Sequence, residues 1–404
     1  MKVKLKHDLW HGDYTLALDL PDRWKVEVLR MEGDKKPVLP KSRLREAVQA
    51  FYPILKGKKE ICVLFDDLTR QTKVSEFAPY LLELFEQCGI RDEQVRFLCA
   101  LGTHAPHDNV ALRKKLGHEI LERFPVYNHN PYEHCTDLGR TKLGTPVLVN
   151  KEYVACDARI GIGTFQPHMF CGFGGGYKII MPGISHMDVM VHHHGTLLNQ
   201  HWDFFGLGRY QGNPLLEDLI EYGRIARLDG KIDVLVNTEA DVTDVYGGDP
   251  DRLYPYMLER APSHYSTTAP GKADIVFANA YCKGNEASIG LSTSECFLKD
   301  EGGDVVVLCN IDEGQVVHYL LGRFGNGSWG QLAFGERKKD PRAKRIFIYS
   351  KYKDLANSFW FGERADLFWY SDLNKLVERL ADDYKDRETT AFVLPDATIQ
   401  MIVP

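Results

Sequence analysis

The stretch EICVLFDDLTRQTKVSEFAPYLLELFEQCGI, residues 60–90, contains a complete strand, loop and helix signal. It begins with a short apolar run that suits a buried strand and continues with the polar segment DDLTRQT. The following residues, 74–88, place apolar side chains at helical spacing, and Gly89 stands where a helix-ending glycine is common. The stretch therefore predicts a strand, a loop and a helix in that order.

The same order recurs in the first half of the chain. VRFLCAL (95–101) predicts a strand, GTHAPH (102–107) a loop and NVALRKKLGHEILERF (109–124) a helix, and ARIGIG (158–163) opens a third unit. Strand, loop and helix in succession indicate a parallel sheet of the α/β class. Ahead of these units, the alternating segments VKLKHDLW and WKVEVLR (3–10 and 24–30) predict an N-terminal β-hairpin.

A second α/β unit is expected after ERAPSHYSTTAPGK, residues 259–272, which is rich in proline, serine and threonine. Predicted strands follow at 273–280, 304–310 and 345–350, and predicted helices at 314–324 and 373–385. The sequence thus predicts two α/β domains, 1–265 and 266–404, with a cleft between them. The last apolar stretch, TAFVLPDATIQMIVP, could return to either domain.

Composition narrows the class of protein. Hydrophobic residues make up 44% of the 404 residues, charged residues 26%, and the formal net charge is -6. These values are typical of a globular protein and give no basic footprint for nucleic acid. No apolar run is long enough for a membrane span, and the first residues lack the apolar region of a signal peptide. The nine cysteines contain no C-x-x-C pair, which favours thiols in a reducing cytoplasm.

Polar residues follow the predicted strands at their carboxyl ends, the edge where open α/β sheets bind ligands. In DDLTRQT, the planar guanidinium of Arg70 suits a carboxylate or a phosphate, although a helix cap with a surface ion pair would give the same pattern. His104, in GTHAPH, can act as a general base near neutral pH or simply hydrogen-bond within its loop.

The segment FQPHMFCGFGGGYKIIMPG, residues 165–183, combines His168, a glycine cluster and Lys178. The glycines permit positive φ angles and a close backbone approach to a ligand. The spacing fits neither the Walker A pattern nor G-x-G-x-x-G. Lys178 is therefore a phosphate partner, a covalent anchor for a cofactor, or a surface lysine beside a glycine turn.

Histidines gather in MDVMVHHHGTLLNQHW, residues 187–202. Neutral imidazole suits nickel, copper and zinc, whereas a solvent-facing helix end would explain the run without a metal. No H-E-x-x-H motif completes a zinc site made by the protein alone. A histidine without carboxylate partners indicates a metal that another group already holds.

Four elements occur together: DDLTR (66–70), GTH (102–104), PHMFCGFGGGYK with MPG (167–183), and a histidine sixteen residues after the lysine. With them the chain resembles the nickel-pincer lactate racemase family over most of its length. The resemblance implies a pyridinium mononucleotide with two sulfur substituents, joined to Lys178 through a thioamide and made by separate maturation enzymes. Nickel would be held by this nucleotide and by His194, or by His193 or His192 if the register differs.

The resemblance also implies roles for the other motif residues. His104 and His168 would form the acid–base pair, and Arg70 would hold the substrate carboxylate. Asp67, Thr69, Gly172, Gly174 and Gly175 would lie near the cofactor. The implied reaction takes a proton and a hydride from a 2-hydroxy acid and returns the hydride to the other face, so that the α-carbon inverts. Two bases on opposite sides allow either enantiomer to react.

One stretch departs from the family pattern. Lactate-specific members carry a Tyr-Gln pair with a lysine three residues after the glutamine, and YCKGNEASIGLSTSE (281–295) places Ser288 and Leu291 there. Lys283 could supply the missing cation from another angle. Asn285, Glu286 and Ser288 could hydrogen-bond a longer hydroxylated substrate such as a sugar acid, or they could form a loop that binds no ligand. Trp360 could reach the cleft, although aromatic residues at its spacing are commonly part of the core.

The sequence therefore supports a nickel-dependent 2-hydroxy acid racemase or epimerase, and the departure argues against lactate itself. A sugar-acid 2-epimerase with the same cofactor is the alternative within this class. A ligand-binding homologue without turnover and a histidine-zinc hydrolase are hypotheses from other classes.

Overall fold

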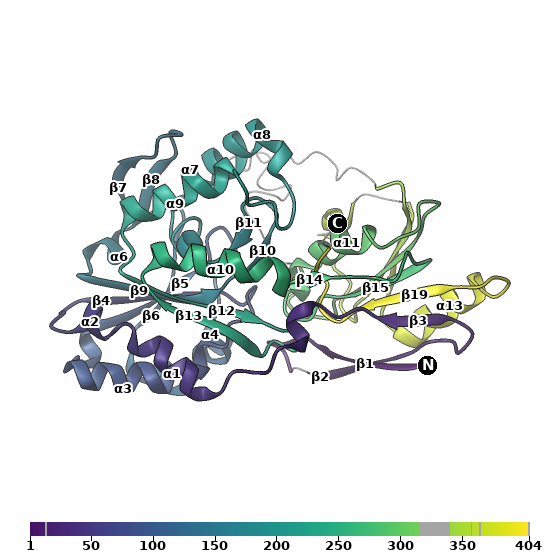
Figure 1. Cartoon of the computed structure of the whole chain (residues 1–404), viewed down its shortest axis with the longest axis horizontal. Coiled ribbons are helices and arrows are strands. Elements are labelled where there is room, and N and C mark those ends of the chain that lie inside the picture. The colour runs from purple at the N-terminus through teal and green to yellow at the C-terminus, as the bar shows by residue number, and fades with distance from the viewer. Residues whose placement is uncertain (13, 316–339, 357, 363–364, 403–404) are drawn as a thin grey trace.

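The computed structural model describes residues 1–12, 14–315, 340–356, 358–362 and 365–402. Two six-stranded sheets occupy the two halves of the molecule (Figure 1), which confirms the predicted α/β class with parallel sheets. Within the described ranges, no helix has the length and apolar character that crossing a bilayer requires. The predicted helix 314–324 lies outside the described residues from residue 316 onward.

The first sheet contains the strands that the repeated units predict. Its order is β13 (Val242–Gly248), β12 (Gly230–Val236), β9 (Ala158–Thr164), β4 (Ile61–Asp66), β5 (Val95–Ala100) and β6 (Val126–Asn128). Only β13 runs antiparallel to its neighbour. β4 is buried on both faces because helices cover both sides of a parallel sheet. Figure 1 shows α1 (Lys41–Gln49) and α3 (Ala78–Cys88) on one side and α9 (Pro214–Ala226) and α10 (Pro250–His264) on the other.

The second sheet is parallel throughout. Its order is β18 (Leu367–Tyr370), β17 (Ala343–Tyr349), β16 (Gly303–Leu308), β15 (Ile275–Asn279), β19 (Thr390–Leu394) and β3 (Lys25–Val28). The strands predicted within 273–280, 304–310 and 345–350 are β15, β16 and β17. The helix predicted at 373–385 is α13 (Leu373–Asp383), and α11 (Ser288–Glu295) follows β15.

The N-terminal hairpin is present, but its second arm differs from the prediction. β1 (Lys2–His7) pairs with β2 (Tyr14–Asp19), whereas the predicted arm 24–30 contains β3, which joins the edge of the second sheet beside β19. Apolar residues of the hairpin, including Leu5 and Leu18, pack in the core of that sheet. In the structure the apolar face of the hairpin packs on the second sheet and β3 covers the edge of β19, so the start of the predicted first domain, 1–265, lies against the second sheet.

The chain end returns to the junction between the two halves. β20 (Met401–Ile402) pairs with β14 (Ser266–Thr267), and Met31 forms a bridge to Thr267. The remaining two-stranded ribbons are β7 (Cys135–Arg140) with β8 (Pro146–Asn150) and β10 (Gln166–His168) with β11 (Gly172–Gly174). β14 thus begins directly after the predicted boundary at residue 265.

Short helices complete the described part of the chain. The α-helices are α2 (Tyr52–Leu55), α4 (Asn109–Leu116), α5 (His118–Arg123), α6 (Lys151–Ala155), α7 (Met187–Met190) and α8 (Leu198–Gln200). The 3-10 helices are η1 (Glu32–Lys35), η2 (Val74–Glu76), η3 (Asp92–Gln94), η4 (Gly176–Ile179), η6 (Trp202–Phe204), η7 (Gly284–Glu286) and η8 (Ser358–Phe361), and η5 (Val191–Leu197) is a π-helix. The polar loops after β4, β5 and β9 leave the first sheet at the same edge.

Candidate active site

The loop after β4 presents Asp67, Thr69 and Arg70 as one hydrogen-bonded chain. Arg70 Nη1 donates to Thr69 Oγ1 at 2.6 Å, and this hydroxyl donates to Asp67 Oδ1 at 2.5 Å. Lys115 holds the loop from below, because its Nζ donates to the carbonyl oxygens of residues 67 and 70 at 2.9 and 3.0 Å and pairs with Asp66 at 2.7 Å. These hydrogen bonds therefore hold the loop, and with it the guanidinium of Arg70, at the edge of the sheet.

Asp67 also orients His104, which follows β5. His104 Nδ1 lies 2.6 Å from Asp67 Oδ2, and because a carboxylate only accepts, Nδ1 carries the hydrogen. Burial lowers the pKa of His104, but the charge of Asp67 and its hydrogen bond outweigh burial and raise this pKa above its ordinary value. Burial raises the pKa of Asp67, yet the charge of His104, their hydrogen bond and Arg70 leave it well below its ordinary value.

The β10–β11 ribbon after β9 carries His168 beside Lys178. A Cβ atom added at Gly174 would lie 3.6 Å from Lys178 Cδ and 3.9 Å from His168 Cβ, so the two side chains flank this glycine. Burial, followed by the charges of Lys178 and Arg70, lowers the pKa of His168 well below its ordinary value. His168 is thus neutral near pH 7, and its pKa is shifted in the direction opposite to that of His104.

The other two predicted glycines serve the packing of the protein itself. Gly172 has φ +72°, and an added Cβ would lie 2.6 Å from the backbone at Arg209 and Tyr210. At Gly175, with φ +107°, an added Cβ would lie 2.6 Å from the ring of Phe165. Both positions need glycine to let segments of this chain approach each other. Of the three, Gly174 is the one that borders Lys178.

Lys178 lies on η4 and is 8% exposed. The turn is fixed from outside, since Gly176 N donates to Asp233 Oδ2 at 2.5 Å and Tyr177 N donates to the hydroxyl of Tyr254 at 2.9 Å. Among the residues that the structure describes, no hydrogen-bond partner contacts Lys178 Nζ. Burial, opposed by Cys171 and reinforced by the charge of Arg70, lowers the pKa of Lys178 to about 8.

The three consecutive histidines occupy η5, and their environments differ. His192 Nδ1 lies 3.0 Å from Thr145 Oγ1, on the side of α9. His193 is fully buried, and burial lowers its pKa to about 3. The ring of Phe170 contacts two histidines. Its centre lies 4.8 Å from that of the His194 ring and 5.3 Å from that of the His168 ring. The structure therefore brings His194, rather than His192, toward His168 and Lys178.

The second half of the molecule contributes Lys283 and Glu286. Glu286 Oε2 lies 3.6 Å from Arg70 Nη1 and 3.7 Å from Lys283 Nζ, and its Oε1 lies 3.6 Å from His104 Nε2. Lys283 is only 2% exposed, so a buried cation is present. Burial raises the pKa of Glu286, but the charges of Lys283, His104 and Arg70 lower it below its ordinary value. Glu286 is therefore an anion between cations from both halves.

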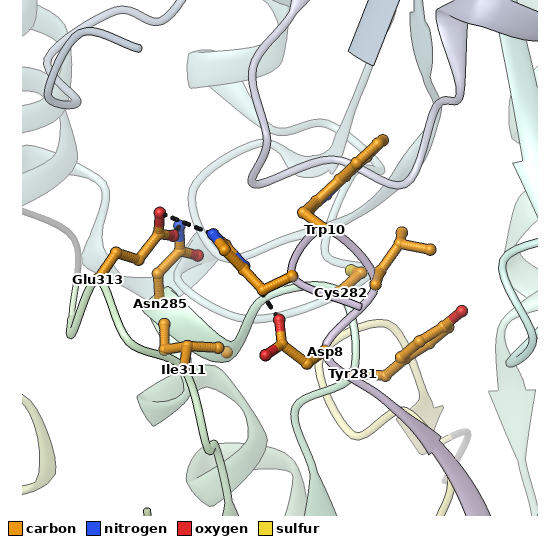
Figure 2. A pocket seen from close by; sticks show the side chains of 10 residues that line it. Asp8, Trp10, Tyr281, Cys282, Asn285, Ile311 and Glu313 are labelled. Carbon is orange, nitrogen blue, oxygen red and sulfur yellow. Dashed lines mark hydrogen bonds and ion pairs between the residues drawn. The ribbon is translucent and has the colours of Figure 1, made fainter. Parts of the chain in front are cut away.

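The other predicted substrate residues are Asn285, Ser288 and Trp360, and Leu291 occupies the place of the lysine in the family pattern. Asn285 lines a small pocket with Asp8, Trp10 and Ile311, and its Nδ2 donates to Glu313 Oε1 at 2.8 Å (Figure 2). Leu291 is fully buried in the core of the second sheet, and Trp360 packs partly buried against the same core. Ser288 is half-buried at the start of α11. Substrate contacts of Asn285, Ser288 and Trp360 stay predictions.

Sequence reasoning missed Lys115, which is fully buried beneath the β4 loop. Its signal was available, because Lys115 shares the buried face of the predicted helix with Leu112 and Leu116. A charged residue on the apolar face of a helix requires a buried partner. Phe170, the ring between His168 and His194, carried no such signal.

Comparison with known proteins finds matches to lactate racemases. Residues 11–205 match the lactate racemase N-terminal domain. Lactate racemase of Thermoanaerobacterium thermosaccharolyticum is 24% identical over 359 residues, 85% of this chain and 81% of the relative. Lactate racemase of Lactiplantibacillus plantarum is 27% identical over 273 residues, 65% of this chain and 62% of the relative.

Solved structures show the same fold. The lactate racemase apoprotein from Thermoanaerobacterium thermosaccharolyticum aligns with a TM-score of 0.71 at 17% identity and 100% coverage of both chains. A protein from Thermotoga maritima aligns with a TM-score of 0.67 at 16% identity, covering 91% of this chain and 100% of that one.

Fold and site together define a two-sheet α/β protein with a buried lysine and histidines at the ligand-binding edge of its first sheet. Together with the sequence matches, they make the chain similar to the lactate racemases, and residues 11–205 match the N-terminal domain of that family.

Proposed function

We propose that this protein is a racemase or epimerase that inverts the α-carbon of a 2-hydroxy acid, using a nickel-pincer nucleotide attached to Lys178. One observation carries the proposal: a buried amine without a hydrogen-bond partner among the described residues adjoins His168, at a site that also holds Arg70 and His104. The matches to proteins named lactate racemase support the reaction class.

The residues fit such a group. With its pKa lowered to about 8, Lys178 is partly unprotonated near neutral pH, and an unprotonated amine is the form that joins a cofactor covalently. His194 supplies a neighbouring imidazole for nickel. When bound, the group would accept and return a hydride, a step for which protein side chains lack the chemistry.

The side chains of this chain would bind the substrate and move its hydroxyl proton. Arg70 and Lys283 supply cations for the carboxylate. Neutral His168 would take the hydroxyl proton of one enantiomer, while protonated His104 would supply a proton on the other side. For the opposite enantiomer the roles exchange. Asp67 stabilises the protonated form of His104 by its charge and its hydrogen bond.

Glu286 favours an acid with further hydroxyl groups over lactate. Its carboxylate lies beside Arg70, where it would repel the carboxylate of a small acid and could accept a hydrogen bond from a further hydroxyl group. A sugar-acid 2-epimerase is therefore the second candidate within the same chemistry. The family pattern has a lysine where this sequence has Leu291, which is buried in the core. Lys283 would supply the cation in place of that lysine.

We infer a cytoplasmic location, where maturation enzymes would supply the cofactor. All nine cysteines are free thiols in the structure, which agrees with a reducing compartment.

The test compares wild-type protein with Lys178→Ala after co-expression with cofactor-maturation enzymes. We expect wild-type protein to gain the mass of the nucleotide and to contain nickel, and Lys178→Ala to gain neither. Zinc bound equally by both proteins would favour the histidine-zinc hydrolase instead.

A panel of single-enantiomer 2-hydroxy acids, including lactate and aldonic acids, is then followed by chiral chromatography. Inversion should be slower with deuterium at the α-carbon, because the bond to that hydrogen breaks. Ligand binding without inversion of any acid would favour the non-catalytic homologue and contradict the proposal.

A further inference from the structure

His193 is the fully buried neighbour of His194, and each of its ring nitrogens has a defined partner. Its Nε2 lies 2.9 Å from the carbonyl oxygen of Leu215, and its Nδ1 lies 3.0 Å from His194 Nδ1. The nearest carboxylate oxygen of Asp218 is 4.0 Å from Nε2, beyond hydrogen-bond distance. The carbonyl of Leu215 is therefore the acceptor that determines where His193 carries its hydrogen.

A carbonyl oxygen only accepts hydrogen bonds, so the hydrogen of neutral His193 is on Nε2 and its Nδ1 has a lone pair. The short contact between the two Nδ1 atoms needs one hydrogen, which must then come from His194. With its hydrogen on Nδ1, neutral His194 has its lone pair on Nε2. A metal ligand needs that lone pair at the nitrogen that faces the metal.

Local structure makes this contact possible. η5 is a π-helix, which winds its residues more loosely than an α-helix, and the rings of His193 and His194 lie 5.0 Å apart. Thr145 donates to Asp218 at 2.6 Å and meets His192 at 3.0 Å, so the third histidine belongs to a separate hydrogen-bond chain.

We propose that His193 is a positioning residue that fixes His194 in the Nδ1–H tautomer and so presents Nε2 as the metal-binding nitrogen. The part of this proposal that concerns nickel rests on the proposed function, whereas the tautomer itself is a property of the protein without cofactor. Outer partners of metal-ligating histidines commonly change metal affinity about 10–100-fold when they are removed.

Two substitutions separate the two hydrogen bonds of His193. In His193→Asn, the side-chain oxygen takes the place of Nδ1 and keeps an acceptor for His194. In His193→Gln, the amide nitrogen takes the place of Nε2 and keeps the donor to Leu215, but the acceptor is lost. His192→Gln is the matched control, because His192 meets Thr145 in a hydrogen-bond chain separate from that of His193 and His194.

The first measurement uses protein expressed without maturation enzymes and labelled with ¹⁵N in the histidine rings. Two-bond ¹H–¹⁵N correlation reports the tautomer, and the His194 signals are identified by their loss in His194→Gln. We expect the Nδ1–H tautomer in wild-type protein, His193→Asn and His192→Gln, and a shift toward Nε2–H in His193→Gln. An Nε2–H tautomer in the wild-type protein overturns the proposal, whatever the variants show.

The second measurement follows nickel loss from cofactor-loaded protein into excess chelator. We expect loss to be about 10–100-fold faster for His193→Gln than for wild type, with substantial rescue in His193→Asn. Equal rates for His193→Gln and wild type overturn the link to the metal. If no nickel loads into wild-type protein, the proposed function fails, while the tautomer measurement still decides the role of His193.

Discussion

Asp67 on one side, and burial with the charge of Lys178 on the other, shift the pKa values of two histidines in opposite directions. Asp67 lies 2.6 Å from His104 and raises its pKa, whereas burial and the charge of Lys178 lower that of His168. An acid and a base of unequal pKa on one substrate are the arrangement that proton transfer to and from a hydroxyl group requires. The proposed roles of both histidines therefore depend on their neighbours as much as on the imidazole rings.

Replacing Asp67 by asparagine tests this dependence at the scale of one residue. For the enantiomer that reacts with neutral His168, His104 must be protonated, so the rate falls as the pH rises through the pKa of His104. Asp67→Asn removes the charge that raises this pKa, and we expect the alkaline limb of kcat/KM to move to lower pH by roughly 1–2 units. The exposed Asp382→Asn should leave the limb in place. An unmoved limb in Asp67→Asn would show that His104 is not the acid.

Single residues also show where prediction from sequence stops. Arg70, His104, His168 and Lys178 lie together as their shared position at strand ends predicts. The reason for Gly172 could not be predicted, because the backbone at Arg209 that it must clear comes from a distant part of the chain.

At the scale of elements, the loop after β4 depends on one buried side chain of α4. Lys115 pairs with Asp66, donates to two loop carbonyls, and places its Nζ 4.9 Å from the centre of the Trp10 ring. Removing one partner of a buried ion pair commonly costs about 3–5 kcal/mol because the other charge stays buried. The loop that carries Arg70 is thus tied to the helix that follows the next strand.

We expect Lys115→Met, which keeps the length of the side chain, to lower the free energy of unfolding by about 3–5 kcal/mol. The exposed neighbour Lys114→Met should change it by less than about 0.5 kcal/mol. Urea unfolding followed by circular dichroism measures both. Equal stabilities of the two variants would mean that the Lys115 network contributes little.

Elements were predictable where their signal is local. The units around β4 and β5 follow from apolar runs and helical spacing within about 30 residues. The partner strand of β3 was not predictable, because a strand's neighbours depend on which sheet edge remains open after the whole chain has folded. The same holds for η5, where three histidines in sequence indicate a metal or a surface and carry no sign of a π-helix.

At the scale of the whole molecule, Glu286 joins the two halves at the site. Its carboxylate, from the segment after β15, contacts Arg70 and His104, which follow β4 and β5 of the other sheet. The sequence predicted a site between two α/β units, and among the described residues of the second unit Glu286 pairs with Arg70 and His104 and lies beside Lys283. A substrate carboxylate that binds Arg70 must therefore share this cation with a carboxylate of the protein.

Glu286→Gln keeps the shape of the side chain and removes its charge. Repulsion between two carboxylates at this range is about 1 kcal/mol, so we expect KM for a small 2-hydroxy acid such as lactate to fall roughly five-fold. A sugar acid should gain less, because its further hydroxyl group loses a charged acceptor. The control is Glu313→Gln, since Glu313 faces Asn285 and His11 in the neighbouring pocket (Figure 2). Unchanged KM values for both acids in Glu286→Gln would mean that the substrate carboxylate binds away from Arg70. The proposed position of the acid between the two sheets would then be wrong.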